Sequence, residues 1–469
     1  MMARRHDLKH LLDPKSIAVI GASNRDGSIG RIILERLMPS LRKLYPVHPR
    51  EPVIMGYEAC PDIDALPAGI DIAVIATGAE AAVSAAEACA SKGIPFLIIV
   101  AGGFGETGEE GIRRERRLLN IAHRSGTRIL GPNSLGIFIP HERLDTIFVE
   151  HGDKALGRGG GVVFITQSGS VGVEALGLAS NTGYGMRAFI GLGNKCDLDE
   201  LDFLDFFGRD PETKCLAFYL ENIAHGRRFL EKARQIAPHK PVLVLKAGRT
   251  PAGARAVSSH TGRLAGMDAV VSGAFRQYGI QRVFDDEELC DASKCLAMLP
   301  TAAGRRVAVL TPAGGFGVMC ADHIEADRRG IPLSMAALKP HTVRRIREAT
   351  FPFAACENPV DLTASADDGM FGRSLDALLE DDGVDIVICT AFFAPPAISD
   401  GLIQEIARRA KHSAKPVVTF TQYGPFTDLY LRRFHDAGVV GFPSIRRTVR
   451  AVRFLVERAR ILAALEERS

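Results

Sequence analysis

The chain has 469 residues, of which 46% are hydrophobic and 24% are charged, and its formal net charge at pH 7 is +3. A chain of this length exceeds what one hydrophobic core normally supports, so we expect two or three domains. The small net charge excludes the basic excess that is typical of proteins that bind nucleic acid or membrane surfaces, and we expect neither as a partner.

The nine cysteines are scattered, and no pair of them is spaced as CxxC. This spacing argues against a disulfide framework and a zinc site, and no other cluster of metal ligands is evident, so we expect no metal on this chain. The basic N-terminus leads into a mixed polar segment and not into an apolar signal core, and no apolar run reaches membrane-spanning length. We therefore expect a cytoplasmic protein.

The first segment opens with a strand, a glycine-rich turn and a helix. The apolar run 16–20 is followed by Gly21, Ala22 and Ser23, and Gly27 and Gly30 come next. Such a turn points the N–H groups of a helix start at a phosphate, although the glycines can also serve only to let helix and strand pack closely. Further strands are expected at 45–47, 71–76, 96–100 and 128–130, with helices at 32–41, 80–92 and 109–125, which predicts a doubly wound parallel sheet.

A nicotinamide-dependent enzyme is the obvious alternative for this segment. The spacing of Gly21, Gly27 and Gly30 is not GxGxxG, however, and the stretch 44–49 lacks the acidic residue that would hold the ribose of NAD. A nucleotide with a free phosphate tail fits better.

Two further alternations of strands and helices follow, and both predict flavodoxin-like sandwiches. The second follows a glycine-rich joint at 157–161, with strands at 162–166, 186–190, 215–220 and 242–245 and helices at 172–182, 198–206 and 227–236. The third opens after 300–304, with strands at 307–310, 385–389, 416–420 and 439–441.

The first turns of these two segments match each other. Thr166-Gln-Ser-Gly169-Ser-Val-Gly172 corresponds to Thr311-Pro-Ala-Gly314-Gly-Phe-Gly317. Each turn can present N–H groups and the positive end of a helix to an anion, so two helices could hold one phosphate between them. The alternative is that such units often begin with glycine for packing alone. The candidate phosphate ligands are Ser168, Gly169, Ser170, Gly314 and Gly315.

One histidine and one glutamate are the candidate catalytic residues. His260 is predicted to lie in a glycine-flanked loop, 257–266, between a strand at 241–245 and a helix at 268–278, where neutral imidazole could act as a nucleophile toward phosphorus. An ordinary exposed loop histidine is the alternative. Glu221 follows the apolar run 216–220 at the carboxyl end of a predicted strand, where it could orient His260 or simply cap a turn.

These residues resemble signatures of the NDP-forming acyl-CoA synthetase superfamily, specifically the α subunits of ADP-forming acetate–CoA ligases, which are relatives of succinyl-CoA synthetase. The resemblance runs in order over nearly the whole chain. It rests on Pro14 to Ser23, Tyr45 to Pro49, Gly131 to Gly136, Gln167 to Gly172, Gly193 to Asp197, Tyr219 to Glu221, Lys246 to Arg249, Ser259 to Gly266 and Asn358 to Leu362.

The resemblance implies an α/β protein with three doubly wound parallel-sheet domains. Residues 1–145 would form a CoA-binding Rossmann domain with Gly21, Ala22, Ser23, Gly30 and Asn133 at the cofactor. Residues 155–298 would form a flavodoxin-like CoA-ligase domain that carries the phosphohistidine His260 with Glu221 as its partner. Residues 304–469 would form a second flavodoxin-like ligase domain, and the helices that start near Gly169 and Gly314 would flank the phosphate.

The implied reaction interconverts a small carboxylic acid, CoA and ATP with acyl-CoA, ADP and phosphate. No segment resembles the ATP-grasp domain of these ligases, so ATP and Mg²⁺ are expected on a separate β subunit. The expected assembly of this chain is a hetero-oligomer or a homodimer. Arg263, Met267 and Phe316 depart from the family pattern and bear on which acid is used. The alternative to the enzyme is a CoA- or acyl-CoA-binding regulatory module without turnover.

Overall fold

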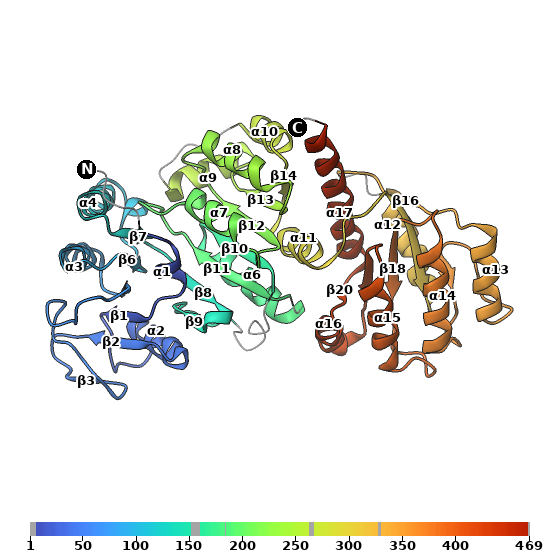
Figure 1. The fold of residues 1–469 in the computed structure, drawn as a ribbon, viewed down its shortest axis with the longest axis horizontal. Helices are drawn as coiled ribbons and strands as arrows, with labels where there is room; N and C mark the ends of the chain where they lie inside the picture. Colours follow the sequence, from blue (N-terminus) through green and yellow to red (C-terminus); the bar gives the residue numbers. More distant parts are fainter. Residues whose placement is uncertain (1–5, 152–159, 183, 262–266, 327–329, 468–469) are drawn as a thin grey trace. The chain divides into compact units, whose positions relative to one another are not determined.

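The computed structural model describes residues 6–151, 160–182, 184–261, 267–326 and 330–467 (Figure 1). The chain forms two compact units, one of residues 1–177, 185–236 and 244–282 and one of residues 178–184, 237–243 and 283–469. Within the described ranges, no helix is both long enough and apolar enough to cross a bilayer.

The first sheet is parallel and has the order β2-β1-β5-β6-β7. Strands β1, β5, β6 and β7 are short, mainly apolar and buried along their length, as expected for a sheet with helices on both faces, whereas β2 is partly exposed. Helix α2 ends earlier than predicted because Pro39 follows it in a short 3₁₀ turn, where proline cannot continue the α-helical hydrogen bonds. The elements are α1 (Lys9–Leu12), β1 (Ser16–Ile20), α2 (Ile29–Leu37), η1 (Met38–Ser40), β2 (Lys43–Val47), the hairpin β3 (Val53–Ile54) and β4 (Tyr57–Glu58), β5 (Ile72–Ile75), α3 (Ala79–Ser91), β6 (Phe96–Ile99), η2 (Gly105–Thr107), α4 (Glu109–Ser125) and β7 (Arg128–Leu130).

The second sheet has seven strands in the order β14-β13-β12-β10-β11-β8-β9. Strands β8 (Gly136–Ile139) and β9 (Leu144–Asp145) are antiparallel additions that the sequence did not reveal, and β8 pairs with β11 so that Phe138 lies opposite Phe189. Both strands lie within residues 1–145, so this sheet also uses part of the chain that the sequence assigns to the first domain. The other elements are η3 (Pro140–Glu142), β10 (Val162–Thr166), α6 (Gly169–Thr182), β11 (Met186–Gly191), α7 (Glu200–Arg209), β12 (Cys215–Leu220), α8 (Gly226–Ile236), β13 (Val242–Lys246), α9 (Pro251–Thr261), α10 (Asp268–Gln277) and β14 (Ile280–Val283).

The third sheet is also parallel, with the order β16-β15-β18-β19-β20 and β17 paired to β15. The four strands predicted for this sheet are present, and their bounds differ from the predicted ones by about one residue. The three sheets together confirm the predicted fold class, a mostly parallel α/β protein. The elements are α11 (Asp286–Met298), β15 (Arg306–Thr311), α12 (Gly314–Ala326), β16 (Ser334–Met335), α13 (Pro340–Ala349), β17 (Val360–Asp361), α14 (Asp368–Glu380), β18 (Ile386–Thr390), α15 (Gly401–His412), β19 (Val417–Phe420), η4 (Gly424–Phe426), α16 (Thr427–Asp436), β20 (Val440–Phe442) and α17 (Ile445–Glu466).

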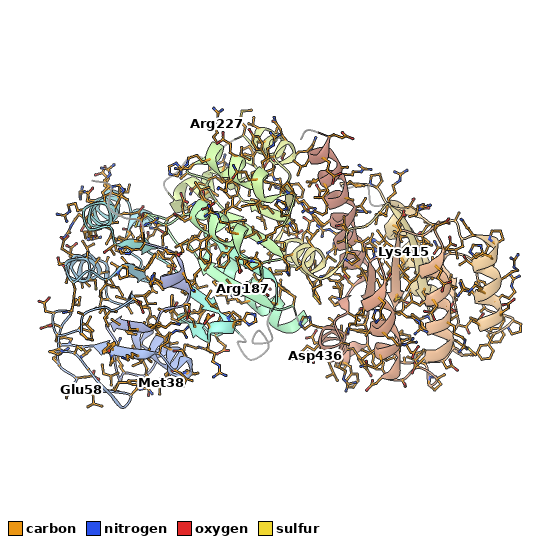
Figure 2. The ribbon with its side chains drawn as sticks, in the orientation of Figure 1. Met38, Glu58, Arg187, Arg227, Lys415 and Asp436 are labelled. Carbon is orange, nitrogen blue, oxygen red and sulfur yellow. The ribbon has the colours of Figure 1, made fainter. Side chains whose placement is uncertain are left out.

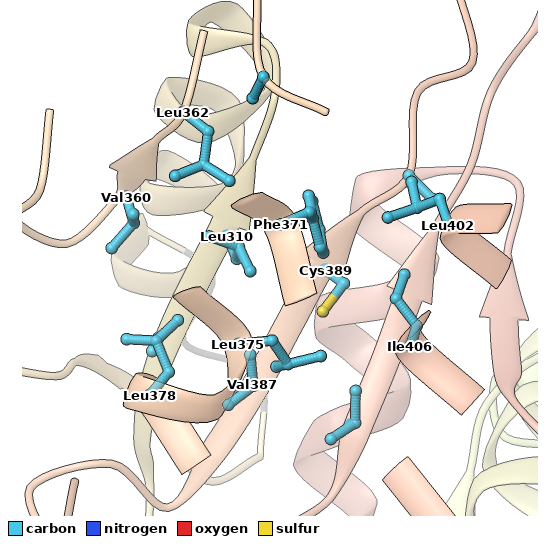
Figure 3. Packing of buried hydrophobic residues seen from close by; sticks show 14 of the residues in the cluster. Leu310, Val360, Leu362, Phe371, Leu375, Leu378, Val387, Cys389, Leu402 and Ile406 are labelled. Atoms are coloured by element: carbon cyan, nitrogen blue, oxygen red, sulfur yellow. The ribbon is translucent and has the colours of Figure 1, made fainter. Parts of the chain in front are cut away.

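Apolar side chains from this sheet and its helices form a continuous core. Leu310, Val387 and Cys389 on the strands pack with Phe371 and Leu375 of α14 and with residues of α15 (Figure 3). Charged side chains such as Glu58 and Arg227 are exposed (Figure 2). The buried sheets are rigid supports for the loops at their carboxyl edges, which is where folds of this kind bind their ligands.

Candidate functional site

The carboxyl edge of the first sheet carries the predicted phosphate-binding turn. Strand order reverses between β1 and β5, and ligands of such sheets bind in the crevice at this point. Gly21 has φ +88°, and a Cβ there would lie 2.9 Å from the carbonyl oxygen of Ala76, so the turn requires glycine. A Cβ on Gly30 would overlap the carbonyl of Gly21, which gives Gly30 a packing role. Ala22 is fully buried, so only its backbone could reach a cofactor.

Asn133 lies at the same edge, directly after β7. It is exposed and has φ +56°, a conformation that asparagine tolerates better than most residues. Its side-chain Nδ2 lies 3.4 Å from Oδ1 of Asn194, which comes from the loop after β11. The amide of Asn194 in turn donates to Glu106 at 2.6 Å and to Glu115 at 3.1 Å. This network therefore joins the carboxyl edges of the first two sheets.

The carboxylate of Glu106 organises the loop after β6. Burial alone would raise the pKa of Glu106, but hydrogen bonds from Asn194 and from the N–H groups of Gly103 and Phe104 outweigh this effect and lower the pKa below its ordinary value. Glu106 is therefore an ionised anchor. The same loop contains η2, which contacts helix α9.

The turn at the start of α6 is shaped by Thr166. The buried Thr166 hydroxyl donates to the carbonyl of Ser168 at 2.7 Å and accepts from the N–H of Ser168 at 3.1 Å. Gly169 and Ser170 are exposed at the helix start, and a Cβ on Gly169 would have nothing within 4 Å. The start of α6 is therefore exposed, and the first N–H groups of a helix have no partner within the helix, so an anion can approach them.

The turn at the start of α12, in the second compact unit, has the same construction. Thr311 Oγ1 donates to the carbonyl of Ala313 at 2.8 Å and accepts from the N–H of Ala313 at 3.0 Å. Gly315 is exposed, but a Cβ on Gly314 would lie 2.5 Å from Oδ2 of Asp361. A carboxylate therefore already lies against this helix start. The two turns share the same pair of threonine hydrogen bonds, whereas phosphate binding by Gly314 and Gly315 stays a prediction.

Glu221 lies where the sequence placed it, at the carboxyl end of β12, and it is buried. Its N–H and that of Asn222 both donate to Oε1 of Gln167, at 3.0 and 3.3 Å. Gln167 belongs to the Thr166 turn, so the turn and Glu221 are held side by side. Burial and the negative charge of Glu221 together raise the pKa of Tyr219 to about 12.

The predicted loop around His260 is wrong for residues 257–261, which continue a helix. Helix α9 spans Pro251–Thr261, with proline at its first position and the Thr250 hydroxyl accepting from the N–H of Gly253 at 3.1 Å. Both are helix-start signals that outweigh the small residues further on. The backbone of His260 therefore lies in the last turn of α9. The remainder of the predicted loop, residues 262–266, lies outside the described residues, and so does Arg263.

The sequence reasoning missed three buried polar side chains around Glu221. Gln167, Lys195 and Lys246 are 8%, 5% and 8% exposed, and each hydrogen-bonds the backbone of Glu221 or Asn222. Lys246 ends the apolar strand β13, just as Glu221 follows β12. The signal that identified Glu221, a charged residue at the carboxyl end of a buried strand, would have identified Lys246 as well.

The candidate residues of the first compact unit thus form two neighbouring groups. Gly21, Ser23 and Asn133 lie at one carboxyl edge, and Ser168, Gly169, Ser170 and Glu221 lie at the next. A separate cavity of about 1050 Å³ beside α7 and α8 is lined by residues such as Arg128, Asp199 and His225, and by none of the candidates. Cavity size therefore does not mark the proposed site.

Two parts of the chain match described protein families. Residues 15–140 match the CoA binding domain, and residues 159–296 match the succinyl-CoA ligase like flavodoxin domain. Together these matches cover the first two sheets apart from β9, and all the candidate residues before residue 296.

Named relatives match the chain over almost its whole length. The α subunit of ADP-forming acetate–CoA ligase II from Pyrococcus furiosus is 35% identical over 97% of this chain and 98% of its own length. ADP-forming acetate–CoA ligase I from Archaeoglobus fulgidus is 34% identical over 97% of this chain and 64% of its own length.

Among solved structures, the dinucleotide-forming acetyl-coenzyme A synthetase 1 of Ca. Korarchaeum cryptofilum, in complex with phosphate and ADP, is similar with a TM-score of 0.88. It is 32% identical, and the match covers 98% of this chain and 99% of that one. The chain therefore belongs to the NDP-forming acyl-CoA synthetase superfamily, in the family of ADP-forming acetate–CoA ligase α subunits.

Proposed function

We propose that this chain is the α-type subunit of an ADP-forming acid–CoA ligase. The observation that carries the proposal is the pairing of the Gly169 turn with Glu221 through Gln167, in a chain that matches such a subunit from end to end. A helix start that is open to an anion, beside a buried carboxylate, is an arrangement that suits phosphoryl transfer.

In the direction of thioester synthesis, a ring nitrogen of His260 attacks the γ-phosphorus of ATP, so that a nitrogen–phosphorus bond forms and ADP leaves. A carboxylate oxygen of the acid then attacks that phosphorus, which frees the imidazole and gives an acyl phosphate. The thiolate of CoA attacks the acyl carbon, and phosphate leaves. The reverse sequence makes ATP from acyl-CoA, ADP and phosphate.

Within this scheme, the candidate residues have separate roles. Glu221 would accept a hydrogen bond from one imidazole N–H, stabilise the positive charge that develops on the ring, and hold the other nitrogen toward phosphorus. The N–H groups at Ser168, Gly169 and Ser170 would bind the phosphoryl oxygens, and Gly314 and Gly315 are the candidates for the opposite side. The turn of Gly21, Ala22 and Ser23, with Gly30 behind it and Asn133 beside it, would hold the phosphates of CoA.

We further propose that ATP and Mg²⁺ bind an ATP-grasp β subunit on another chain. Two observations support a partner. The Pyrococcus relative, which this chain matches over 98% of its length, is itself named a subunit, and the longer Archaeoglobus ligase is matched over 64% of its length. A hetero-oligomer is therefore the expected assembly. The relatives are named ligases, which supports turnover over a purely regulatory CoA-binding role.

The direct experiment is to purify this chain together with its native partner and to screen small carboxylic acids, acetate first, for release of phosphate. Release should require the acid, CoA and ATP together. A complex that binds CoA but releases no phosphate with any acid would instead favour the regulatory role.

A further inference from the structure

The peptide that carries Glu221 is held by side chains instead of by a neighbouring strand. The two N–H groups of Glu221 and Asn222 donate to Gln167, as described above. The carbonyl of Glu221 accepts from Nζ of Lys246 at 2.7 Å, and the carbonyl of Asn222 accepts from Nζ of Lys195 at 2.9 Å. All four backbone polar groups of this dipeptide are therefore fixed by buried side chains from three other strand ends.

The two lysines differ in how their charges are balanced. Lys195 is paired with the carboxylate of Glu200 at 2.8 Å, and both side chains are almost fully buried. The hydrogen bonds of Lys246 go to two carbonyls, those of Glu221 and Ala247, both at 2.7 Å. Among the described residues, no carboxylate forms an ion pair with Lys246. Its ammonium therefore places a positive charge against the backbone of Glu221.

A buried ammonium without a paired carboxylate is costly to keep. Burial is the main reason that the pKa of Lys246 lies below its ordinary value, and the charges of Arg282 and Lys195 lower it further, while the charges of Glu221 and Asp268 raise it. Two carbonyl hydrogen bonds alone could be made by a neutral group. The positive charge of Lys246 has a further effect when a phosphoryl group approaches Glu221, because it then stabilises the negative charge that gathers there.

We propose that Lys246 is a positioning residue for Glu221, an inference that rests on the function proposed above. Its ammonium holds the Glu221 carbonyl in place, so that the carboxylate keeps its orientation, and its charge offsets the charge that phosphohistidine brings. Lys195 and Gln167 hydrogen-bond the remaining backbone groups of the same dipeptide, and we call the three side chains together the clamp. Lys246 acts through Glu221 and does not touch the reacting atoms.

The test compares Lys246→Met with Lys246→Arg in the complex with the native partner. Single-turnover labelling of this chain by γ-labelled ATP should slow about 10- to 100-fold in Lys246→Met, the usual cost of losing a residue that orients a reacting group. The Kd for CoA should stay unchanged, and Lys246→Arg, which keeps the charge, should recover part of the rate.

Lys294→Met is the matched control. Lys294 is another buried lysine that donates to a backbone carbonyl, that of Gly441 at 3.0 Å, but it lies on α11 in the second compact unit. Its loss should leave the labelling rate of the folded protein unchanged. A wild-type labelling rate in Lys246→Met, or an equal slowing in Lys294→Met, would overturn the inference.

Amide hydrogen exchange separates this inference from the proposed function. Exchange at Glu221 and Asn222 should become faster in Lys246→Met than in the wild type, whether or not the complex turns over. If the wild type takes no label, the proposed function fails, and the exchange rates alone decide whether Lys246 holds the peptide. If the wild type is labelled and exchange at Glu221 does not change, the function stands and the clamp is refuted.

Discussion

Asn194 donates a 2.6 Å hydrogen bond to Glu106, and this contact joins the loop after β11 to the loop after β6. The same amide reaches Asn133, a candidate ligand of CoA, through its oxygen. The Asn194 side chain therefore connects the edge proposed to bind CoA with the edge proposed to carry the phosphoryl group. The loop that holds Glu106 also contacts α9, whose last turn contains the backbone of His260.

Asn194→Ala should weaken CoA binding. The change removes the hydrogen bonds to Glu106 and Asn133 and frees the Asn133 side chain, at a cost of about 1 to 2 kcal/mol, or roughly 5- to 30-fold in Kd. Isothermal titration of CoA into the variant measures this directly. Asn120→Ala on the exposed side of α4 is the control, and it should bind CoA like the wild type. Equal affinities in both variants would show that Asn194 has no part in the CoA site.

Gly30→Ala should disrupt the same edge by another route. A Cβ at Gly30 would overlap the carbonyl of Gly21, so α2 has to move away from the turn. We expect a loss of about 1 to 3 kcal/mol in unfolding free energy, together with weaker CoA binding. Urea unfolding and CoA titration measure the two effects. Gly177→Ala in α6, where a Cβ would have nothing within 4 Å, should be neutral or stabilising.

Thr166→Val tests whether the hydroxyl shapes the Gly169 turn. Valine has the same size, but it cannot replace the two hydrogen bonds to Ser168, so we expect a loss of about 1 to 3 kcal/mol in stability and slower phosphoryl transfer. Thr311→Val removes the same contacts from the matching turn and also the acceptor of the buried Thr390 hydroxyl, so it should cost at least as much. A neutral result at both positions would mean that the shared contacts do not determine the turn.

Lys294 should make stability depend on alkaline pH. Burial lowers its pKa in the folded protein to about 8, compared with 10.5 for an ordinary lysine. Between these values the unfolded chain holds a proton that the folded chain has released, so stability rises with pH across this window and is lost as pH falls through it. Relative to Lys294→Met, the wild type should gain about 2 to 3 kcal/mol between pH 8 and pH 10. Urea unfolding of both proteins at these pH values measures the difference, and parallel pH profiles would contradict it.

Buried strands were the easiest part of the fold to predict from the sequence. Strands such as Val162–Thr166 and Cys215–Leu220 are continuous apolar runs ended by glycine or polar residues, and they have the predicted bounds. The β8 and β9 strands were missed because they are short and their pairing with β11 depends on residues far along the chain. Residues 257–261 of α9 were predicted as part of a loop because the small residues and the glycines beyond them outweighed the helix-start signal at Thr250 and Pro251.

The candidate site could be predicted only at positions where a charged residue or a glycine-rich turn directly follows a buried strand. Glu221 and the Gly169 turn meet that condition. The contact between Gln167 and Glu221 spans 54 residues of sequence, and the bonds from Lys195 and Lys246 end on backbone carbonyls, which are the same at every position. Because these contacts depend on the three-dimensional fold and not on a local pattern of side chains, they could not be predicted from the sequence.

Glu221→Gln should separate binding from phosphoryl transfer. The amide keeps the size of the side chain but loses the charge that stabilises the imidazolium, so phosphorylation of His260 should slow while CoA still binds normally. Rapid-quench labelling and CoA titration measure the two properties. If the variant is phosphorylated at the wild-type rate, Glu221 does not orient the histidine.

The most direct measurement is labelling of this chain by γ-labelled ATP in the presence of its partner. The wild type should acquire phosphate that is stable in base and labile in acid, as phosphohistidine is, and His260→Asn should acquire none. Label of the same kind and amount on His260→Asn would contradict the proposal and place the carrier on another residue.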